Sequence, residues 1–319
     1  MGFTDLIKFA FSMIYTITLN PTLDITIDVE ELVYDDVNKV IGENRRPSGK
    51  GIDISRVIKE LGGETTALGF IGGYRGLELE GILINEGIIC DFIRTSSETR
   101  SNIIIHQKKK RLKTLLSTSD PGLSTLDISL FLDKIKVIPK GNYVVISSGY
   151  PIGINDSLFP QMITNLNERG VRVILDADGD VFKKGIHARP YMIKPNIHEF
   201  SRLVNKQIKD VGEIIEHARP LLDNMDVIVV SMGQKGALAI TKEETIQAIP
   251  PAVKVRNSMG AGDSLIAGMA FMLSMGNTIE DALSLGVACG TASTLNHTYS
   301  IVTKKDVEEI KNFVTIKKF

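Results

Sequence analysis

Short runs of apolar, mostly β-branched residues alternate along this chain with stretches whose apolar residues recur at helical spacing, and this alternation constrains the fold most. In residues 51–61, for example, Ile54, Val57, Ile58 and Leu61 would share one helical face. Strands that alternate with helices favour a mostly parallel sheet with right-handed crossovers and helices on both faces. The runs predicted to be strands are 13–19, 65–71, 102–106, 143–147, 171–176, 191–194, 226–231 and 236–240.

Two charged segments, residues 24–40 and about 91–119, depart from this pattern because they alternate apolar and polar residues. Such alternation is typical of antiparallel strands that have one face in solvent. We therefore expect a small antiparallel sheet that projects from the main one. The basic run 108–111 is interpreted as the exposed tip of a hairpin in that sheet.

Acidic and basic residues are almost balanced, since the 319 residues carry a formal net charge of −1. This excludes a broad basic surface for nucleic acid, so any anionic ligand must be met by a few placed cations and backbone amides. The sequence has no apolar run of 18 residues and predicts no transmembrane helix, hence no membrane partner. The partners expected are small molecules.

The cysteine content and the first residues bear on location. Cys90 and Cys289 are the only cysteines, and we interpret both as small core residues of a cytoplasmic protein. Residues 1–12 have neither the basic start nor the long apolar core of a secretory signal. We expect them to be an extension outside the fold, or the chain to start in nature at Met13.

The strongest local signal is Gly260-Ala261-Gly262-Asp263, which leads into an apolar stretch predicted to be helical. Two glycines permit a tight turn whose N–H groups point at one place, and the start of a helix adds partial positive charge. The segment therefore predicts an anion hole, with Asp263 as general base toward a hydroxyl beside the anion. A glycine-rich turn with Asp263 as a capping residue is the alternative.

Three further segments have features of a site for a phosphate or a sugar. Gly49-Lys50-Gly51 opens the first predicted helix and combines bare backbone with an ammonium group. Asp24 follows the first strand, at the sheet edge where α/β proteins bind ligands, and Arg100 can bind phosphate bidentately. The respective alternatives are a surface loop, an Asx turn and a lone arginine at a sheet edge.

A fourth segment joins the end of a strand to the start of a helix. Asn196 and Glu199 would share one face of a helical turn, and Asp176 ends the preceding strand. Together they predict a site for a water-coordinated Mg²⁺, with a plain helix cap as the alternative.

Two familiar nucleotide-binding motifs are excluded by their spacing. Gly49-Lys50 lacks the upstream glycine of a Walker A loop. Neither Gly49-Lys50-Gly51 nor Gly260-Ala261-Gly262 has the third glycine of a dinucleotide fingerprint, which disfavours a nicotinamide-dependent oxidoreductase.

Taken in order, these segments resemble the motifs of the PfkB family of carbohydrate kinases, from Met13 to about Val314. The resemblance implies a ribokinase-like, three-layer α/β/α fold in one domain over residues 13–319. The central sheet would be mostly parallel, and a small β-sheet lid would take its strands from about 24–46 and 91–119. Lids of this kind also pair between subunits, which implies a homodimer.

The same resemblance implies a role for each motif residue. The anion hole and base would be Gly260, Ala261, Gly262 and Asp263. The residues facing ATP would be Lys194, Asn196, Ser231, Gly233, Gly236 and Asn296. Those facing Mg²⁺ would be Asp176, Asn196 and Glu199. Those facing the sugar phosphate would be Asp24, Lys39, Gly49, Lys50, Gly51, Arg100 and Asn102, with Lys39, Lys50 and Arg100 on its phosphate.

Within the family, the details are similar to the phosphohexose branch, which holds 1-phosphofructokinase, tagatose-6-phosphate kinase and the minor 6-phosphofructokinase. The implied activity is ATP-dependent phosphorylation of a ketohexose phosphate, first of all fructose 1-phosphate to fructose 1,6-bisphosphate. Fructose 6-phosphate and tagatose 6-phosphate are alternative acceptors. A kinase homologue that binds a sugar phosphate without turnover is the more distant alternative.

Several residues depart from the family pattern. Ser48 stands in place of a glycine, Asp53 in place of an asparagine, and Lys39 in place of a frequent arginine. The added negative charge of Asp53 either weakens phosphate binding or marks a different sugar. Residues 296–300 lack the glycine usual near the adenine, which leaves a requirement for K⁺ open.

Overall fold

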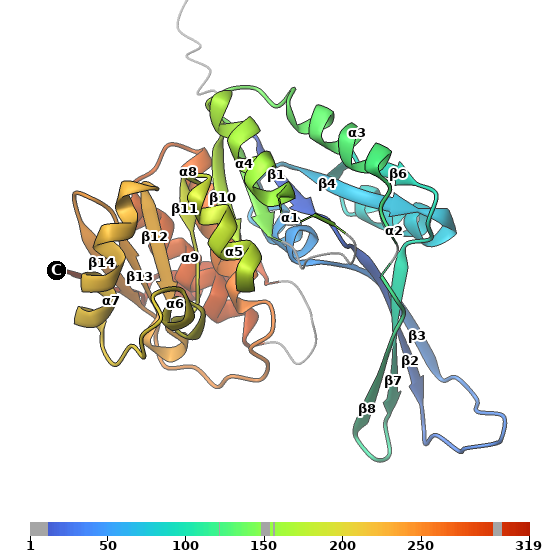
Figure 1. Cartoon of the computed structure of the whole chain (residues 1–319). Coiled ribbons are helices and arrows are strands. Elements are labelled where there is room, and N and C mark those ends of the chain that lie inside the picture. The colour runs from blue at the N-terminus through green and yellow to red at the C-terminus, as the bar shows by residue number, and fades with distance from the viewer. Residues whose placement is uncertain (1–11, 121, 148–153, 156, 296–301) are drawn as a thin grey trace, which may run out of the picture.

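A long central sheet lies between two layers of helices, and a smaller sheet projects from one end of it (Figure 1). This computed structural model describes residues 12–120, 122–147, 154–155, 157–295 and 302–319. The α/β fold with a mostly parallel central sheet, predicted from the alternation of apolar runs, is confirmed. Residues 1–11, expected to be an extension, lie outside the described residues.

The main sheet runs from the C-terminal strand at one edge to residues 89–95 at the other. In spatial order its strands are β15 (Thr315–Lys318), β14 (Thr245–Ile249), β13 (Ala237–Ile240), β12 (Val227–Ser231), β11 (Met192–Ile193), β10 (Arg172–Asp176), β9 (Tyr143–Ser147), β1 (Ile14–Thr18), β4 (Thr65–Gly72) and β5 (Ile89–Cys90), with β6 (Ile93–Thr95) also on β4. The strands from β12 to β6 pair in parallel. The three pairs at the other edge, β12 with β13, β13 with β14 and β14 with β15, are antiparallel.

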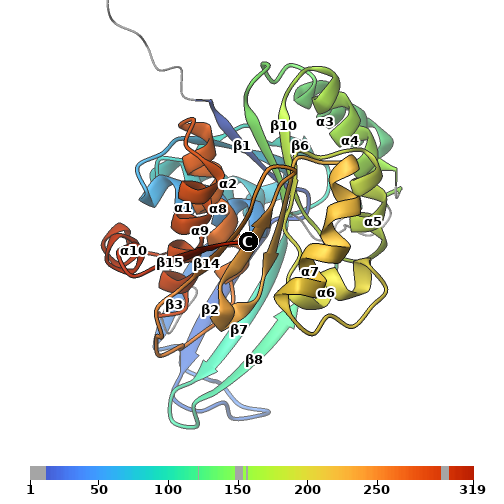
Figure 2. The ribbon, with the colours of Figure 1, turned by 90° about the vertical axis from the view of Figure 1, so that its left-hand side faces the viewer.

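Helices cover both faces of this sheet, as Figure 2 shows from the side. One face packs against α3 (Thr125–Ile135), α4 (Leu158–Glu168), α5 (Gly179–His187), α6 (Ile197–Leu203) and α7 (Val211–Ala218). The other packs against α1 (Lys50–Glu60), α2 (Gly73–Asn85), α8 (Ala261–Ser274), α9 (Ile279–Ser293) and α10 (Lys304–Lys311). The central strands are buried on both sides, which explains why their sequences are nearly all apolar.

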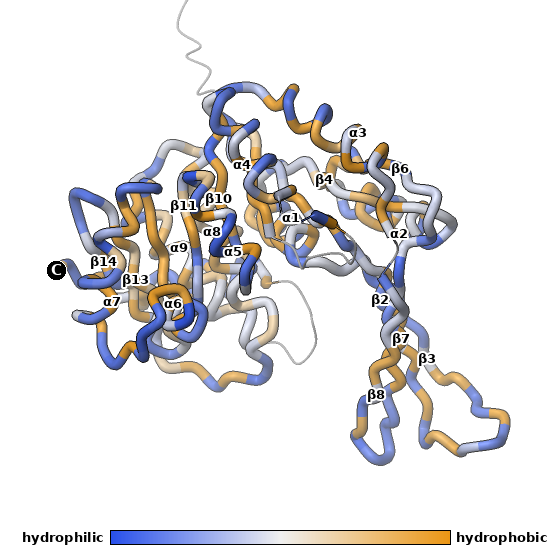
Figure 3. Tube along the Cα trace, in the orientation of Figure 1, coloured by the Kyte–Doolittle hydropathy of each residue, from blue (hydrophilic) through white to orange (hydrophobic). Residues whose placement is uncertain are grey.

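The smaller sheet, called the lid below, contains β3 (Gly42–Ser48), β2 (Thr22–Val29), β7 (Arg100–Gln107) and β8 (Leu112–Ser117) in that spatial order. Hydrophobic and hydrophilic residues mix along it (Figure 3), as the alternating pattern predicted. The expectation of a wholly antiparallel sheet is wrong at its centre, because β2 and β7 pair in parallel. Both strands enter the lid from the main sheet, β2 after β1 and β7 after β6, so they run the same way.

The second charged segment is divided between the two sheets. Residues 93–95 form β6 in the main sheet, and only β7 and β8 belong to the lid. The run 102–106 lies in the lid within β7, and the basic run 108–111 forms the turn between β7 and β8, as expected. Among the helices of the described residues, none has the length and apolar character needed to cross a bilayer.

Candidate active site

The glycine-rich segment before α8 has the geometry predicted for an anion hole. Gly260 is the N-cap residue in the left-handed conformation, with φ of 79°, and the helix proper starts at Ala261. No side chain in the described part of the chain caps α8, so amides of its first turn stay available to an anion. The helix behind them is buried from Ser264 to Ala270, which fixes the hole against the core.

Asp263 lies in the first turn of α8, where it meets both acidic and basic neighbours. Burial, together with the negative charge of Asp176, raises the pKa of its carboxyl to about 7, although Lys50 and Lys194 act to lower it. A general base works best when its pKa is near the working pH, because it is then both ionised and basic. The surroundings of Asp263 thus fit the role of proton acceptor.

Asp176, at the end of β10, joins the two lysines of the site. Its Oδ2 accepts a hydrogen bond from Ser147 Oγ at 2.8 Å and lies 3.4 Å from Lys50 Nζ, while its Oδ1 lies 3.3 Å from Lys194 Nζ. Burial works against the charged form of Asp176, but the two ammonium groups and Ser147 hold its pKa below the ordinary value. Lys194 is buried and close to α8, since a methyl group built on Gly262 would lie 3.2 Å from its Nζ.

The three residues predicted to hold magnesium do not fit direct ligation. Asn196 and Glu199 form a capping box at the start of α6, in which Asn196 Oδ1 accepts from two backbone amides and Glu199 Oε2 accepts from the Asn196 amide at 2.8 Å. Asp176 is already bound by Ser147 and two ammonium groups. Across the described residues, no three His, Cys, Asp or Glu side chains gather closely enough to hold a metal ion. Side chains of the described residues therefore do not form a site that binds a metal ion directly.

The segments expected to face ATP lie along adjacent strand ends. Asn196, after β11, forms a β-bridge with Ser231 at the end of β12. The loop that follows turns tightly: Met232 donates its amide hydrogen to the carbonyl of Gly236 at 2.8 Å, and Gly233 and Gly236 both have positive φ. A side chain at 236 would collide with the Ala248 carbonyl. Asn296, the sixth predicted ATP contact, lies outside the described residues.

The start of α1 forms the second glycine-rich helix end of the site, beside the end of β1. Gly49 caps α1 with φ of 145°, and a Cβ there would lie 2.5 Å from Thr18 Cγ2. At Gly51 a Cβ would lie 2.6 Å from Thr18 Oγ1, which itself accepts the amide hydrogen of Ile52 at 3.0 Å. Only bare backbone allows this approach, and it fixes the position from which Lys50 reaches Asp176.

Polar side chains at the base of the lid form a row across its strands. Asn102 donates to Asp24 Oδ1 at 2.7 Å and accepts from Ser117 Oγ at 2.8 Å, so a row of hydrogen-bonding groups crosses three strands. Arg100 lies one row nearer the main sheet, with its Nε 3.7 Å from Asp120 Oδ1. That buried Nε has no hydrogen-bond partner among the described residues.

The structure brings most of the predicted site residues together, but not Lys39. The lid strands β2 and β3 pair from Thr22 with Ser48 at the base to Asp28 with Gly42 at the far end. Lys39 lies in the connection beyond that far end and is exposed, so it does not reach Lys50 or Arg100 within one chain.

Sequence reasoning missed residues that support the site from elsewhere in the chain. Ser147 ends a buried strand, a position that could have signalled it, and Thr18 likewise ends β1. Arg46 and Arg56 carry no local signal, because their role depends on partners distant in sequence.

Comparison with known proteins agrees with this geometry. A family model described as pfkB family carbohydrate kinase matches residues 17–305. A 1-phosphofructokinase of Borreliella burgdorferi is 34% identical over 285 residues, which are 89% of this chain and 92% of that protein. A D-tagatose-1-phosphate kinase of Bacillus licheniformis is 32% identical over 296 residues, 92% of this chain and 96% of that protein.

Among solved structures, phosphofructokinase-2 from Escherichia coli in complex with potassium superimposes with a TM-score of 0.87. It is 28% identical, and the match covers 95% of this chain and 99% of that one. The same enzyme has also been solved in a tetrameric inhibited form.

Proposed function

Since the chain belongs to the pfkB family of carbohydrate kinases, we propose that it transfers the terminal phosphoryl group of ATP to a free hydroxyl of a ketohexose phosphate. One observation carries the proposal: Asp263, with a pKa near 7, lies at the uncapped glycine-rich start of α8 beside Lys194 and Lys50. Phosphoryl transfer needs positioning and charge stabilisation more than covalent chemistry, and this arrangement supplies both.

In the proposed reaction, the oxygen of the sugar hydroxyl bonds to the terminal phosphorus of ATP, and Asp263 accepts the proton of that hydroxyl. The bond from that phosphorus to the bridging oxygen breaks, and ADP leaves with the bond's electron pair. The amides at 260–262 and the α8 N-terminus stabilise negative charge on the phosphoryl group as it moves. Lys194, held by Asp176, adds positive charge on the same side.

ATP is proposed to enter with Mg²⁺ held by phosphate and water oxygens, because Asp176 and Glu199 are already engaged. Such chemistry fits a cytoplasmic location, where nucleotides and sugar phosphates are available. Replacing K⁺ by tetramethylammonium in the assay tests the open question of a monovalent cation, since a relative was solved with potassium.

Fructose 1-phosphate is the first choice of acceptor. It is favoured because two relatives at 34% and 32% identity are named for phosphorylating sugar 1-phosphates. The test is a parallel kinetic panel of fructose 1-phosphate, fructose 6-phosphate and tagatose 6-phosphate, with ribose and fructose as controls. Turnover on a phosphorylated ketohexose at least a hundredfold above the controls is expected. If the sugars bind and no ADP is released, the proposed kinase activity is refuted, and the protein is a kinase homologue that binds sugar phosphates without turnover.

Arg100 is the residue proposed to select a phosphorylated acceptor, because its buried Nε has no hydrogen-bond partner within the described part of the chain and a phosphate oxygen would supply one. Arg100→Ala should lower kcat/KM for fructose 1-phosphate by an amount equivalent to about 1.5–3 kcal/mol. Residual activity on free fructose should change little. An equal loss on both sugars would refute this role.

We also propose that the lid pairs with the lid of a second copy. The strand register places a set of half-exposed apolar residues on the face opposite Asp24 and Asn102. That set is Ile25, Ile27, Ile103, Ile105 and Leu116.

Light scattering after gel filtration tests the pairing. Ile105→Lys should shift the mass of the particle from two chains to one, while Leu126→Lys, on the exposed face of α3, should leave it unchanged. A single-chain mass for the unaltered protein would refute the dimer.

A further inference from the structure

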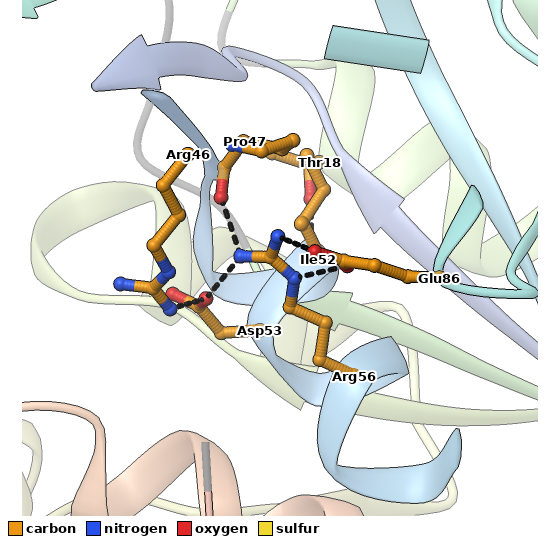
Figure 4. A network of polar contacts seen from close by, with 7 residues as sticks. All are labelled: Thr18, Arg46, Pro47, Ile52, Asp53, Arg56 and Glu86. Carbon is orange, nitrogen blue, oxygen red and sulfur yellow. Dashed lines mark hydrogen bonds and ion pairs between the residues drawn. The ribbon is translucent and has the colours of Figure 1, made fainter. Parts of the chain in front are cut away.

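A buried guanidinium supports the start of α1, where Thr18 also contacts the helix (Figure 4). The side chain of Arg56 is 3% exposed. Its Nε and Nη2 donate to the two carboxylate oxygens of Glu86 at 2.7 and 2.5 Å, and its Nη1 donates to the carbonyl of Pro47 at 2.7 Å. The planar guanidinium group of Arg56 thus links α1 to Glu86, which ends α2, and to Pro47, which lies three residues before Lys50.

The Pro47 carbonyl needs this donor because of its place in the lid. Strand β3 is the outer strand of the lid sheet and has β2 on one side only. Proline fits such an edge because it has no amide hydrogen to leave unpaired, but the carbonyl of the buried Pro47 still requires a partner. Arg56 takes the place of the missing strand and ties the base of the lid to the core helix.

A second contact links the same two elements. Arg46 of β3 forms an ion pair with Asp53 Oδ1 of α1, and Arg56 Nη1 lies 4.0 Å from that oxygen. Burial raises the pKa of Asp53 to about 6 although both arginines act to lower it. Arg46 is paired in register with Asp24, so this network extends to the row of polar groups at the lid base.

We propose that Arg56 is a positioning residue for the sugar-phosphate site, with Glu86 as its counter-ion. It acts through the Pro47–Lys50 segment, which it holds against α1, while Thr18 accepts the amide hydrogen of Ile52 and lies against Gly49 and Gly51. The inference rests on the proposed function, since it assigns this segment to the acceptor and not to ATP.

The proposal predicts a separation between the two substrates. Losing the bond to Pro47 would leave the segment before Lys50 with the Arg46–Asp53 ion pair as its remaining side-chain link to α1 among the contacts described above. Misplacement of a binding group by about 1 Å costs up to 10²-fold in rate. The described segments assigned to ATP follow β11 and β12 and hold none of the partners of Arg56 named above, which are Pro47, Asp53 and Glu86. The acceptor site should therefore weaken while the nucleotide site stays as it is.

Arg56→Lys tests this, because a lysine keeps the charge but cannot bind Glu86 and the Pro47 carbonyl in the same bidentate geometry. We expect the KM for fructose 1-phosphate to rise about tenfold or more, with the KM for ATP within twofold. Hydrogen exchange at the amides of 49–53 should become at least tenfold faster. Arg172→Lys is the matched control: Arg172 donates to the Tyr143 hydroxyl at 2.8 Å at the far end of β10 from Asp176, so its loss should leave both KM values unchanged.

A lower melting temperature for Arg56→Lys with both KM values unchanged would reduce Arg56 to a purely structural role and overturn the proposal. An equal rise in both KM values would do the same. Should Arg56→Lys fail to fold, Glu86→Gln provides the second variant, since the amide keeps one acceptor for Arg56; a rise of about threefold in the acceptor KM alone is expected.

Failure of the proposed function gives a different result. The unaltered protein would then phosphorylate none of the sugars. Hydrogen exchange at 49–53, which is measured without substrate, would still decide whether Arg56 holds the segment.

Discussion

The two glycine-rich helix starts of the site, those of α1 and α8, are held in position by different contacts. Each presents bare amides and a charged residue to the ligand region, and neither has a side-chain cap from its own N-cap residue. The α8 start is fixed by the buried apolar helix that follows it. The α1 start is fixed by side chains beyond its first turn. These are Thr18, at the end of β1, and Arg56, one turn later in α1, which is paired with Glu86.

The difference teaches which parts of such a site tolerate change. A helix start held by its own packing is sensitive mainly to substitutions inside it. A helix start held by ion pairs and a neighbouring strand is sensitive to residues far along the chain, here as far as Glu86.

The largest effect should come from the α8 start itself. Asp263→Asn removes the proton acceptor while it keeps the shape of the side chain, so kcat should fall by about 10² to 10⁴ with little change in either KM. Steady-state kinetics and circular dichroism measure this. Turnover near that of the unaltered protein would show that another group takes the proton.

Alanine at the two cap glycines compares the starts directly. Gly260→Ala places a Cβ in open space and costs only the left-handed backbone conformation, about 1–2 kcal/mol of unfolding free energy. Gly49→Ala adds a collision with Thr18 to a backbone conformation that favours glycine, and should cost about 2–4 kcal/mol. Urea unfolding of the two variants measures the order, and a smaller loss for Gly49→Ala would contradict it.

The pH profile probes the charges between the two starts. Asp263 must lose its proton to act, so kcat/KM should rise with pH through about 7. The negative charge of Asp176 helps to raise the pKa of Asp263, so Asp176→Asn should move this rise to lower pH, on the order of one pH unit.

Asp178→Asn is the control for this shift, because Asp178 caps α5 two residues further on and asparagine caps a helix equally well. Its profile should match that of the unaltered protein. A shift toward higher pH in Asp176→Asn would contradict the assigned sign.

The smallest effect is expected at an exposed bridge from the same lid strand. Arg45 of β3 contacts Glu78 of α2 at 2.9 Å, but the side chain of Arg45 is 46% exposed, whereas that of Arg56 is 3% exposed. Because water and salt screen such pairs, Glu78→Gln should change the acceptor KM less than about twofold. A rise equal to that of Glu86→Gln would mean that any contact between lid and core suffices, buried or not.

The parts of the molecule that sequence could predict are those built locally. Runs such as 143–147 are apolar because the strand is buried on both faces, and the segment 260–263 carries its own turn and helix start. The parallel pairing of β2 with β7 was not predictable from the alternation of residues, because it depends on how both strands leave the main sheet.

The same distinction holds within the site. Asp176 was predicted as a magnesium ligand from its position at a strand end, yet its partners come from residues 50, 147 and 194. Asp53, noted only as an added charge, lies beside two arginines that offset it. Long-range ion pairs leave no spacing pattern in a sequence.

The C-terminal strand β15 has a consequence for how the protein behaves in concentrated solution. It covers the edge of β14, whose residues are mostly buried, and presents Lys317 and Lys318 on the outside of the sheet. Lysines on an edge strand discourage the pairing of sheets from different molecules. Removal of residues 315–319 would expose β14 as a flat apolar edge, and the first symptom would be aggregation during expression, with kcat unchanged in the fraction that stays dispersed.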